Sequence, residues 1–200
     1  MKPVTWRTLA VIAAVVCAVC LLPATTDAGP RATDWSAAVY GGRLSDNRIG
    51  EILYFRTQLE PSHVWAVLLS REVYRVTDDL RAELEGNLAR HTGLQDHFEI
   101  NAAFLLRWRR FPWDRFVRTT LAYGVGPSYA LRKPPVERRS GRDPAHLLVF
   151  MPVEVTLAPP ERFERAWKTL VRVHHRSGAY GVISNASGSN FVTLGLRYRF

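Results

Sequence analysis

The feature that most constrains the fold is an alternation of apolar and polar residues that recurs along most of the chain. At the end of the chain one register is entirely apolar: Val192, Leu194, Leu196, Tyr198 and Phe200. The other register holds polar residues such as Thr193, Arg197 and Arg199. A period of two places successive side chains on opposite faces of a β-strand. The alternation therefore predicts an all-β chain whose strands each have one apolar face.

The same alternation occurs in residues 98–108, 117–125 and 147–157. A soluble sandwich also produces this pattern, so strand length has to separate the two classes. Several of these runs reach the roughly 9–11 residues that a tilted strand needs to cross a bilayer. Their length favours a transmembrane barrel.

The connections between these runs alternate between tight and longer. Tight connections are expected at residues 77–79, 111–114 and 158–161. Longer ones are expected at residues 91–97, 132–145 and 177–189. Short turns on one side and longer loops on the other are typical of outer-membrane β-barrels.

The strand count predicts an eight-stranded antiparallel barrel, because an even number closes with both chain ends on one side. The first strand lies within residues 35–56, where AAVYGG and EILYF compete for it. The other seven are residues 63–75, 80–90, 97–110, 115–131, 146–157, 163–176 and 190–200. A final strand ending on Phe200 resembles those that outer-membrane proteins present to their assembly machinery, which we expect as a partner. An ordinary edge strand is the alternative, but an exposed apolar edge invites aggregation in a soluble domain.

The inward register of these strands is rich in charged residues. It holds Glu83, Glu85, Glu99, Arg107, Arg109, Arg118, Glu154, Glu164, Lys168, Arg172, Arg176, Arg197 and Arg199. Since an eight-stranded barrel has no room for an open pore, these charges predict a packed network of salt bridges. A channel is not expected.

The first residues have the layout of a secretory signal peptide: a basic start, a short apolar core and a small-residue exit. We expect residues 1–28 to be removed, leaving residues 29–200 as one barrel domain. A transmembrane anchor is the alternative, but residues 8–22 are shorter than the roughly 20 apolar residues that a spanning helix needs. Both cysteines, Cys17 and Cys20, lie in the apolar core, so we expect no disulfide in the mature domain.

The composition limits which classes of binding partner are expected for the mature chain. Apolar residues make up 47% and the formal net charge is +9. Removal of the signal peptide changes this excess little, and a basic protein favours an anionic partner. Export argues against nucleic acid and leaves phospholipid and lipopolysaccharide as candidates. No second apolar run of helical length follows the signal, which disfavours a helical membrane protein.

The seventh strand places two polar residues in its outward register, where contact with lipid makes them costly. His175 and Ser177 share that register, while His174 faces the interior. With both chain ends in the periplasm, the strand rises outward, so the pair lies level with lipopolysaccharide. An imidazole beside a hydroxyl could activate it as a nucleophile.

The segment HHRSGAYG followed by SGSNFVTLGLRYRF resembles the carboxy-terminal motif of the PagL-type lipid A 3-O-deacylases. These are eight-stranded outer-membrane barrels that remove an ester-linked acyl chain from lipid A. The resemblance implies His175 as general base and Ser177 as nucleophile, with no cofactor and no metal. It also implies lipid A, or lipopolysaccharide, as the partner.

The chain departs from that motif at two positions. Gly178 stands where the family usually has an Asn that helps hold the oxyanion, so backbone amides would have to stabilise the charge. The family's acidic residue falls on Ser189 or Asn190. Asn190 lies in the outward register and could face Ser177 across the hairpin, where it could orient His175, as Asn does in papain-like sites.

Two further groups of residues are weaker candidates. His91, His97 and His146 fall at predicted loop edges without metal-ligand spacing, so we expect them to be solvated. One outer loop is strongly basic and could meet the phosphates of lipid A. Its basic residues are Lys133, Arg138, Arg139 and Arg142.

The sequence thus predicts an outer-membrane esterase that removes an acyl chain from lipid A by acyl transfer to Ser177. His175 and Asn190 complete the site, and Gly178 and the basic loop bind substrate. The alternative is a non-catalytic small outer-membrane barrel with a structural or lipopolysaccharide-binding role, which the missing acidic residue favours.

Overall fold

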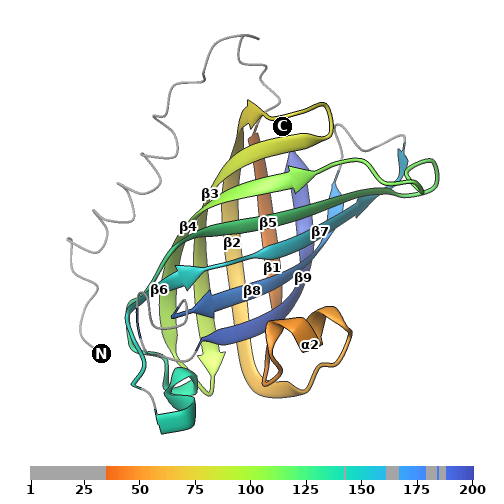
Figure 1. The fold of residues 1–200 in the computed structure, drawn as a ribbon. Coiled ribbons are helices and arrows are strands. Elements are labelled where there is room, and N and C mark those ends of the chain that lie inside the picture. Colours follow the sequence, from red (N-terminus) through yellow and green to blue (C-terminus); the bar gives the residue numbers. More distant parts are fainter. Residues whose placement is uncertain (1–34, 142, 161–166, 179–183, 185–187) are drawn as a thin grey trace.

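The computed structural model describes residues 35–141, 143–160, 167–178, 184 and 188–200, which form a closed antiparallel β-barrel (Figure 1). The predicted signal peptide, residues 1–28, lies outside the described residues. The strands are β1 (Trp35–Ser45), β2 (Leu59–Arg75), β3 (Leu80–Gly93), β4 (His97–Trp108), β5 (Arg118–Ala130), β6 (Leu147–Phe150), β7 (Val153–Ala158), β8 (Lys168–Ser177) and β9 (Ser189–Arg199). Two short helices, α2 (Ile49–Leu53) and η1 (Pro135–Gly141), lie in connections.

Segments β6 and β7 together occupy one strand position of the barrel, so the nine segments correspond to the eight predicted strands. Both lie between β5 and β8. The break falls at Met151 and Pro152, where proline has no amide hydrogen to donate to a sheet. The flanking backbone still bonds to its neighbours: Met151 N donates to His175 O at 2.8 Å, and Gly124 N donates to Pro152 O at 3.0 Å. The pairings β4–β5 and β1–β9 complete the closure.

The first strand is formed by AAVYGG and not by EILYF. Residues 37–42 belong to β1, where they pair with both β2 and β9. EILYF instead contributes to α2, which begins with the Arg48 amide donating to the Glu51 carboxylate at 2.8 Å. Tyr54 and Phe55 follow this helix and are 82% and 95% exposed.

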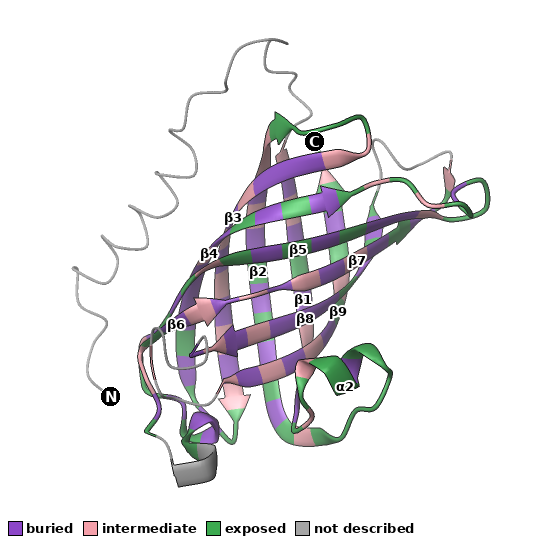
Figure 2. Ribbon diagram, viewed as in Figure 1, coloured by how far each residue is buried: buried purple, intermediate pink, exposed green. Residues whose placement is uncertain are grey.

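The outer face of the barrel is a belt of exposed apolar side chains. Exposed apolar side chains lie on every strand except β3, whose outward residues are half-buried or buried. Green bands mark the exposed positions along the strands (Figure 2). The belt includes Val39, Trp65, Val67, Tyr123, Val125, Val171, Leu194 and Leu196. Such a continuous apolar surface is unfavourable in water and fits the hydrocarbon of a bilayer.

The interior confirms the predicted salt-bridge network. Glu154 accepts hydrogen bonds from Arg107 at 2.7 Å, Arg172 at 2.9 Å and Arg197 at 3.0 Å. Glu83 joins two of these arginines, Arg107 at 2.6 Å and Arg197 at 2.9 Å. Each of these five buried charges therefore has at least two opposite partners, which offset the cost of removing it from water. The network fills the interior where a pore would run.

The other predicted inward charges differ in how far they are buried. Those buried are Glu85, Glu99, Lys168 and Arg176. Arg109, Arg118 and Arg199 are half-buried. Glu164 lies outside the described residues.

The two ends of the barrel differ. β9 ends, and β1 begins, at the end with the β2–β3 turn, whereas α2 and η1 lie at the opposite end (Figure 1). This matches the predicted division into a turn end and a loop end, with two corrections. The connection predicted to be tight at residues 111–114 is longer, because β4 ends at Trp108 and β5 begins at Arg118. Residues 91–97 do not form a long loop, because β3 and β4 continue pairing as far as His91 and His97. No helix among the described residues is long and apolar enough to span a membrane.

Candidate active site

Strand β8 presents its residues as the sequence predicted. The interior register is buried and holds Lys168, Leu170, Arg172, His174 and Arg176. His175 and Ser177 share the exterior register with the exposed Thr169 and Val171, and both are half-buried. They lie at the loop end of the barrel, since β8 leads into the connection to β9 there (Figure 1). The structure thus keeps His175 and Ser177 on one outward face.

Asn190 lies directly opposite His175 in the β8–β9 pairing, and not opposite Ser177 as expected. The two side chains contact each other across this pair. Asn190 Nδ2 donates to the backbone oxygen of Asn47 at 2.9 Å, in the segment between β1 and α2. Because the amide nitrogen is held by Asn47, the amide oxygen is left for His175.

Two buried atoms of this pair have no hydrogen bond of normal geometry among the described residues. They are Nδ1 of His175 and Oδ1 of Asn190. Buried polar atoms usually have a partner, and a protonated Nδ1 and an amide oxygen are complementary. A small rotation of either side chain would join them, with Asn190 accepting from the imidazole. That bond would direct the other ring nitrogen, Nε2, away from β9.

Ser177 is the last residue of β8 and pairs with Val149 of β6. The following Gly178 is buried, and its carbonyl accepts a hydrogen bond from Ser184 N at 3.3 Å. Residues 179–183 and 185–187 lie outside the described part of the chain. The role predicted for backbone amides near Gly178 in binding an oxyanion therefore stays a prediction.

The predicted basic loop lies at the same end of the barrel as Ser177 (Figure 1). Lys133 and Arg138 are exposed there, and Arg139 belongs to η1. Arg142 lies outside the described residues. The loop can therefore present positive charge at the end of the barrel where Ser177 lies.

Helix η1 also closes the end of the barrel. Its Glu137 is fully buried and binds Arg176 at 2.6 Å and Ser189 at 3.1 Å. Burial raises the pKa of the Glu137 carboxyl to about 7, against the lowering effect of Arg176. Val136 packs in the same apolar cluster as Leu44. The basic loop is therefore anchored through its neighbours.

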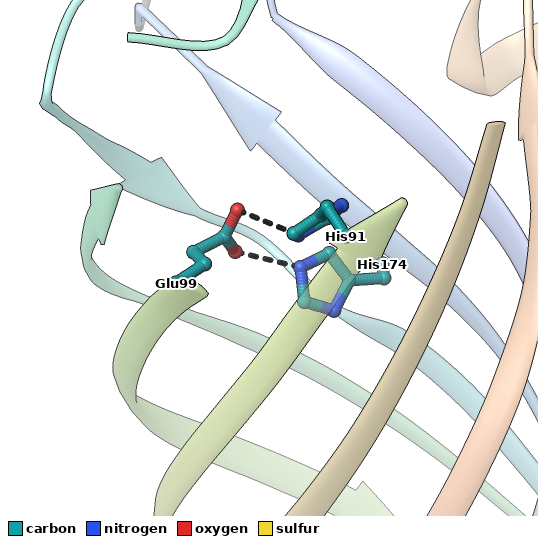
Figure 3. Close-up of side chains that lie close together, drawn as sticks. All are labelled: His91, Glu99 and His174. Carbon is teal, nitrogen blue, oxygen red and sulfur yellow. Dashed lines mark hydrogen bonds and ion pairs between the residues drawn. The ribbon is translucent and has the colours of Figure 1, made fainter. Parts of the chain in front are cut away.

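The expectation that His91 and His97 are solvated is wrong. Both are buried, and their rings stack at a centroid distance of 4.5 Å with an angle of 7°. His91 also lies beside Glu99 and His174, which project into the same region from β4 and β8 (Figure 3). Every second residue from Glu83 faces the interior, and extending this alternation beyond Arg90 would have predicted that His91 is an interior residue. His146, in contrast, is half-buried, and its Nδ1 donates a hydrogen bond to Ala130 O at 2.8 Å.

Comparison with known proteins finds similarity at the level of the fold. No family model matches the chain, and no curated protein matches it. The crystal structure of the outer membrane enzyme PagL is similar with a TM-score of 0.57 and 11% identity, covering 82% of this chain and 99% of PagL. Neisserial surface protein A is similar with a TM-score of 0.51 and 11% identity, covering 83% of this chain and 96% of that one.

These structures define the class of this protein. It is an eight-stranded antiparallel β-barrel with the fold of outer-membrane proteins. At this identity the likeness extends to the fold alone, and that fold is shared by the enzyme PagL and by a surface protein.

Proposed function

We propose that the protein is an outer-membrane esterase that removes an ester-linked acyl chain from lipid A. The observation that carries the proposal is the pairing of His175 with Asn190 on the outward face, two residues from Ser177. His175, Ser177 and Asn190, the proposed base, nucleophile and orienting group, share the outward face that carries the apolar belt. This shared face supports a reaction with a lipid substrate. The PagL-type motif around His175 and Ser177 supports the same reaction.

The reaction begins with the proton of Ser177. Nε2 of His175 accepts it while Oγ attacks the ester carbonyl, and Asn190 holds the imidazole through Nδ1. The tetrahedral intermediate collapses as the imidazolium returns its proton to the departing sugar hydroxyl. Water, activated by the same imidazole, then releases the fatty acid from Ser177. The steps require no metal and no redox partner.

Removal of the Ser177 hydroxyl by substitution tests this proposal. Lipid A from cells that express the wild-type protein should lose one acyl chain, as measured by mass spectrometry. Ser177→Ala should lower the rate by at least about 1000-fold. Thr169→Ala is the matched control, since Thr169 is an exposed hydroxyl on the same face of β8. The proposal fails if Ser177→Ala retains the activity, or if the folded wild-type barrel leaves lipid A unchanged.

A second candidate is a non-catalytic barrel that binds lipopolysaccharide through its basic loop. The observation in its favour is Asn190, whose neutral amide stabilises an imidazolium less than a carboxylate would. The exposed Lys133 and Arg138 supply the phosphate-binding charge. In that case lipopolysaccharide binds the purified barrel, Lys133→Ala weakens binding, and Ser177→Ala changes nothing.

A further inference from the structure

A second constellation lies inside the barrel, on the opposite side of the wall from His175. His91 of β3, Glu99 of β4 and His174 of β8 project toward one another near the loop end (Figure 3). His174 Nε2 is 2.7 Å from Glu99 Oε1, and His91 Nε2 is 3.1 Å from Glu99 Oε2. One atom from each of the three side chains lies within 4.8 Å of the others. All three side chains are at most 1% exposed.

Buried polar atoms without a hydrogen bond of normal geometry gather at this point. His91 Nε2, Glu99 Oε2 and both ring nitrogens of His97 are buried and have no hydrogen bond among the described residues. The side-chain oxygen of Gln95 is also buried without a hydrogen bond among the described residues. Elsewhere in the described interior, the carboxylates Glu83, Glu85 and Glu154 have complete hydrogen bonds. Since buried polar atoms without partners are unfavourable, this concentration points to a bound ligand.

The chemistry of these atoms is that of a metal site. Two imidazoles and a carboxylate form a common ligand set for Zn²⁺. Zinc–ligand bonds of about 2.0–2.1 Å place tetrahedral ligand atoms roughly 3.3 Å apart. Each carboxylate oxygen of Glu99 faces one histidine, with Oε1 at 2.7 Å from His174 Nε2 and Oε2 at 3.1 Å from His91 Nε2. These separations need to widen by about 0.2–0.6 Å to reach the tetrahedral value. His97 Nε2, 4.0 Å from Glu99 Oε2, is available for the fourth position.

The surrounding residues hold the ligands as outer-shell groups of metal sites do. Tyr40 Oη bonds His174 Nδ1 at 2.8 Å, and Asn87 Nδ2 donates to the same Tyr40 oxygen at 2.6 Å. The Gln95 amide bonds His91 Nδ1 at 2.9 Å. Exchange of the Gln95 amide oxygen and nitrogen would let Nδ1–H donate to the oxygen. The Nε2 lone pair of His91 would then point at Glu99.

The local charge also admits a cation. Arg176 lies 3.4 Å from Glu99 Oε2 and is the nearest positive group. Glu137 binds the same arginine at 2.6 Å. Two carboxylates therefore surround one guanidinium, and the histidines add no charge when neutral. These groups together carry no net positive charge that would repel a dication.

We propose that His91, Glu99 and His174 bind a divalent transition metal, with zinc as the ion whose geometry fits best and His97 as a fourth ligand. The ligands come from β3, β4 and β8. Three strands, β2, β1 and β9, lie between β3 and β8 in the sheet order. One ion therefore crosslinks opposite walls of the barrel across its interior. Its role is structural: it fixes the loop end on which the β8–β9 connection is built. The site is independent of the esterase reaction.

Metal content decides the proposal. The full barrel is folded in detergent with a chelator present, then dialysed against Zn²⁺, and the bound zinc is counted by mass spectrometry. We expect one zinc per chain and, with Co²⁺ instead, the visible absorption of tetrahedral coordination. His91→Gln should weaken binding by at least about 100-fold and Tyr40→Phe by about 10–100-fold. His63→Gln is the control, because His63 is exposed on β2.

A folded barrel changes its mobility in electrophoresis on heating, and this shift verifies each variant. Wild-type protein without stoichiometric zinc overturns the proposal, as does full zinc binding by folded His91→Gln. If His91→Gln does not fold, Tyr40→Phe and the Co²⁺ spectrum of the wild type decide. A wild-type spectrum of octahedral cobalt would place the ion outside the barrel and also overturns it.

Discussion

Neutralising Glu154 should destabilise the barrel more than any other change of one carboxylate. This side chain is completely buried and bonds three arginines at 2.7–3.0 Å. Glu154→Gln keeps the shape and one acceptor oxygen but leaves Arg107, Arg172 and Arg197 with one negative charge fewer. Loss of one member of a buried ion pair costs about 3–5 kcal/mol. With a urea dependence of about 2 kcal/mol per molar, the unfolding midpoint should fall by roughly 1.5–2.5 M.

Equilibrium unfolding in phospholipid vesicles, followed by tryptophan fluorescence, measures this shift. Asp79→Asn is the control, since Asp79 pairs at 3.1 Å with Arg110, whose side chain is 72% exposed. An exposed pair contributes about 0–1 kcal/mol, so its midpoint should move by less than about 0.5 M. Equal shifts in the two variants would refute the reasoning. They would mean that water reaches Glu154 and that the interior is not a closed charge network.

Three further predictions test other parts of the structure. Leu194→Arg, in the middle of the lipid-facing register of β9 and 62% exposed, should cost about 2–4 kcal/mol in vesicles, and a neutral effect there would contradict the membrane-facing assignment. The pKa of Glu137 is raised to about 7 from 4.5 when η1 is packed against the barrel. The packed loop therefore keeps a proton that the released loop would lose, so packing of the loop should weaken between pH 5 and 8 by up to roughly 3 kcal/mol. Hydrogen exchange of residues 131–146 measures this, and Glu137→Gln should abolish the pH dependence. Asn190→Asp should raise deacylation by at least about tenfold by stabilising the imidazolium of His175, and an unchanged rate would remove Asn190 from the proposed site.

Most of the barrel could be predicted from local pattern. The seven strands after the first agree with the structure within a few residues, except that the predicted start of the seventh, residues 163–166, lies outside the described residues. The division of β8 into interior and exterior registers is also correct, with Val173 as the one exterior residue of β8 that is buried. The reason is that the strand period of two assigns each side chain to a face without knowledge of its neighbours. The same rule explains why the interior charges were found as a set.

The errors fall where the outcome depends on neighbours across the sheet. Residues 91–97 contain Gly93 and polar residues typical of a loop, yet His91 pairs with His97 because the partner strand continues. EILYF has a strand-like composition but begins at a capped turn and forms α2. Asn190 could be placed on the outward face from sequence, whereas its pairing with His175 depends on the register between β8 and β9.

The sequence by itself determined the class of fold, the lipid-facing belt, and the outward position of His175 and Ser177, because these follow from alternation along single strands. Only the tertiary structure decided which side chains meet. The union of His91, Glu99 and His174 joins positions up to 83 residues apart in sequence across a closed interior. Closure of the barrel brings them together, because the shear between strands sets which residues of β3, β4 and β8 lie at the same height along the barrel axis. No local pattern carries that information.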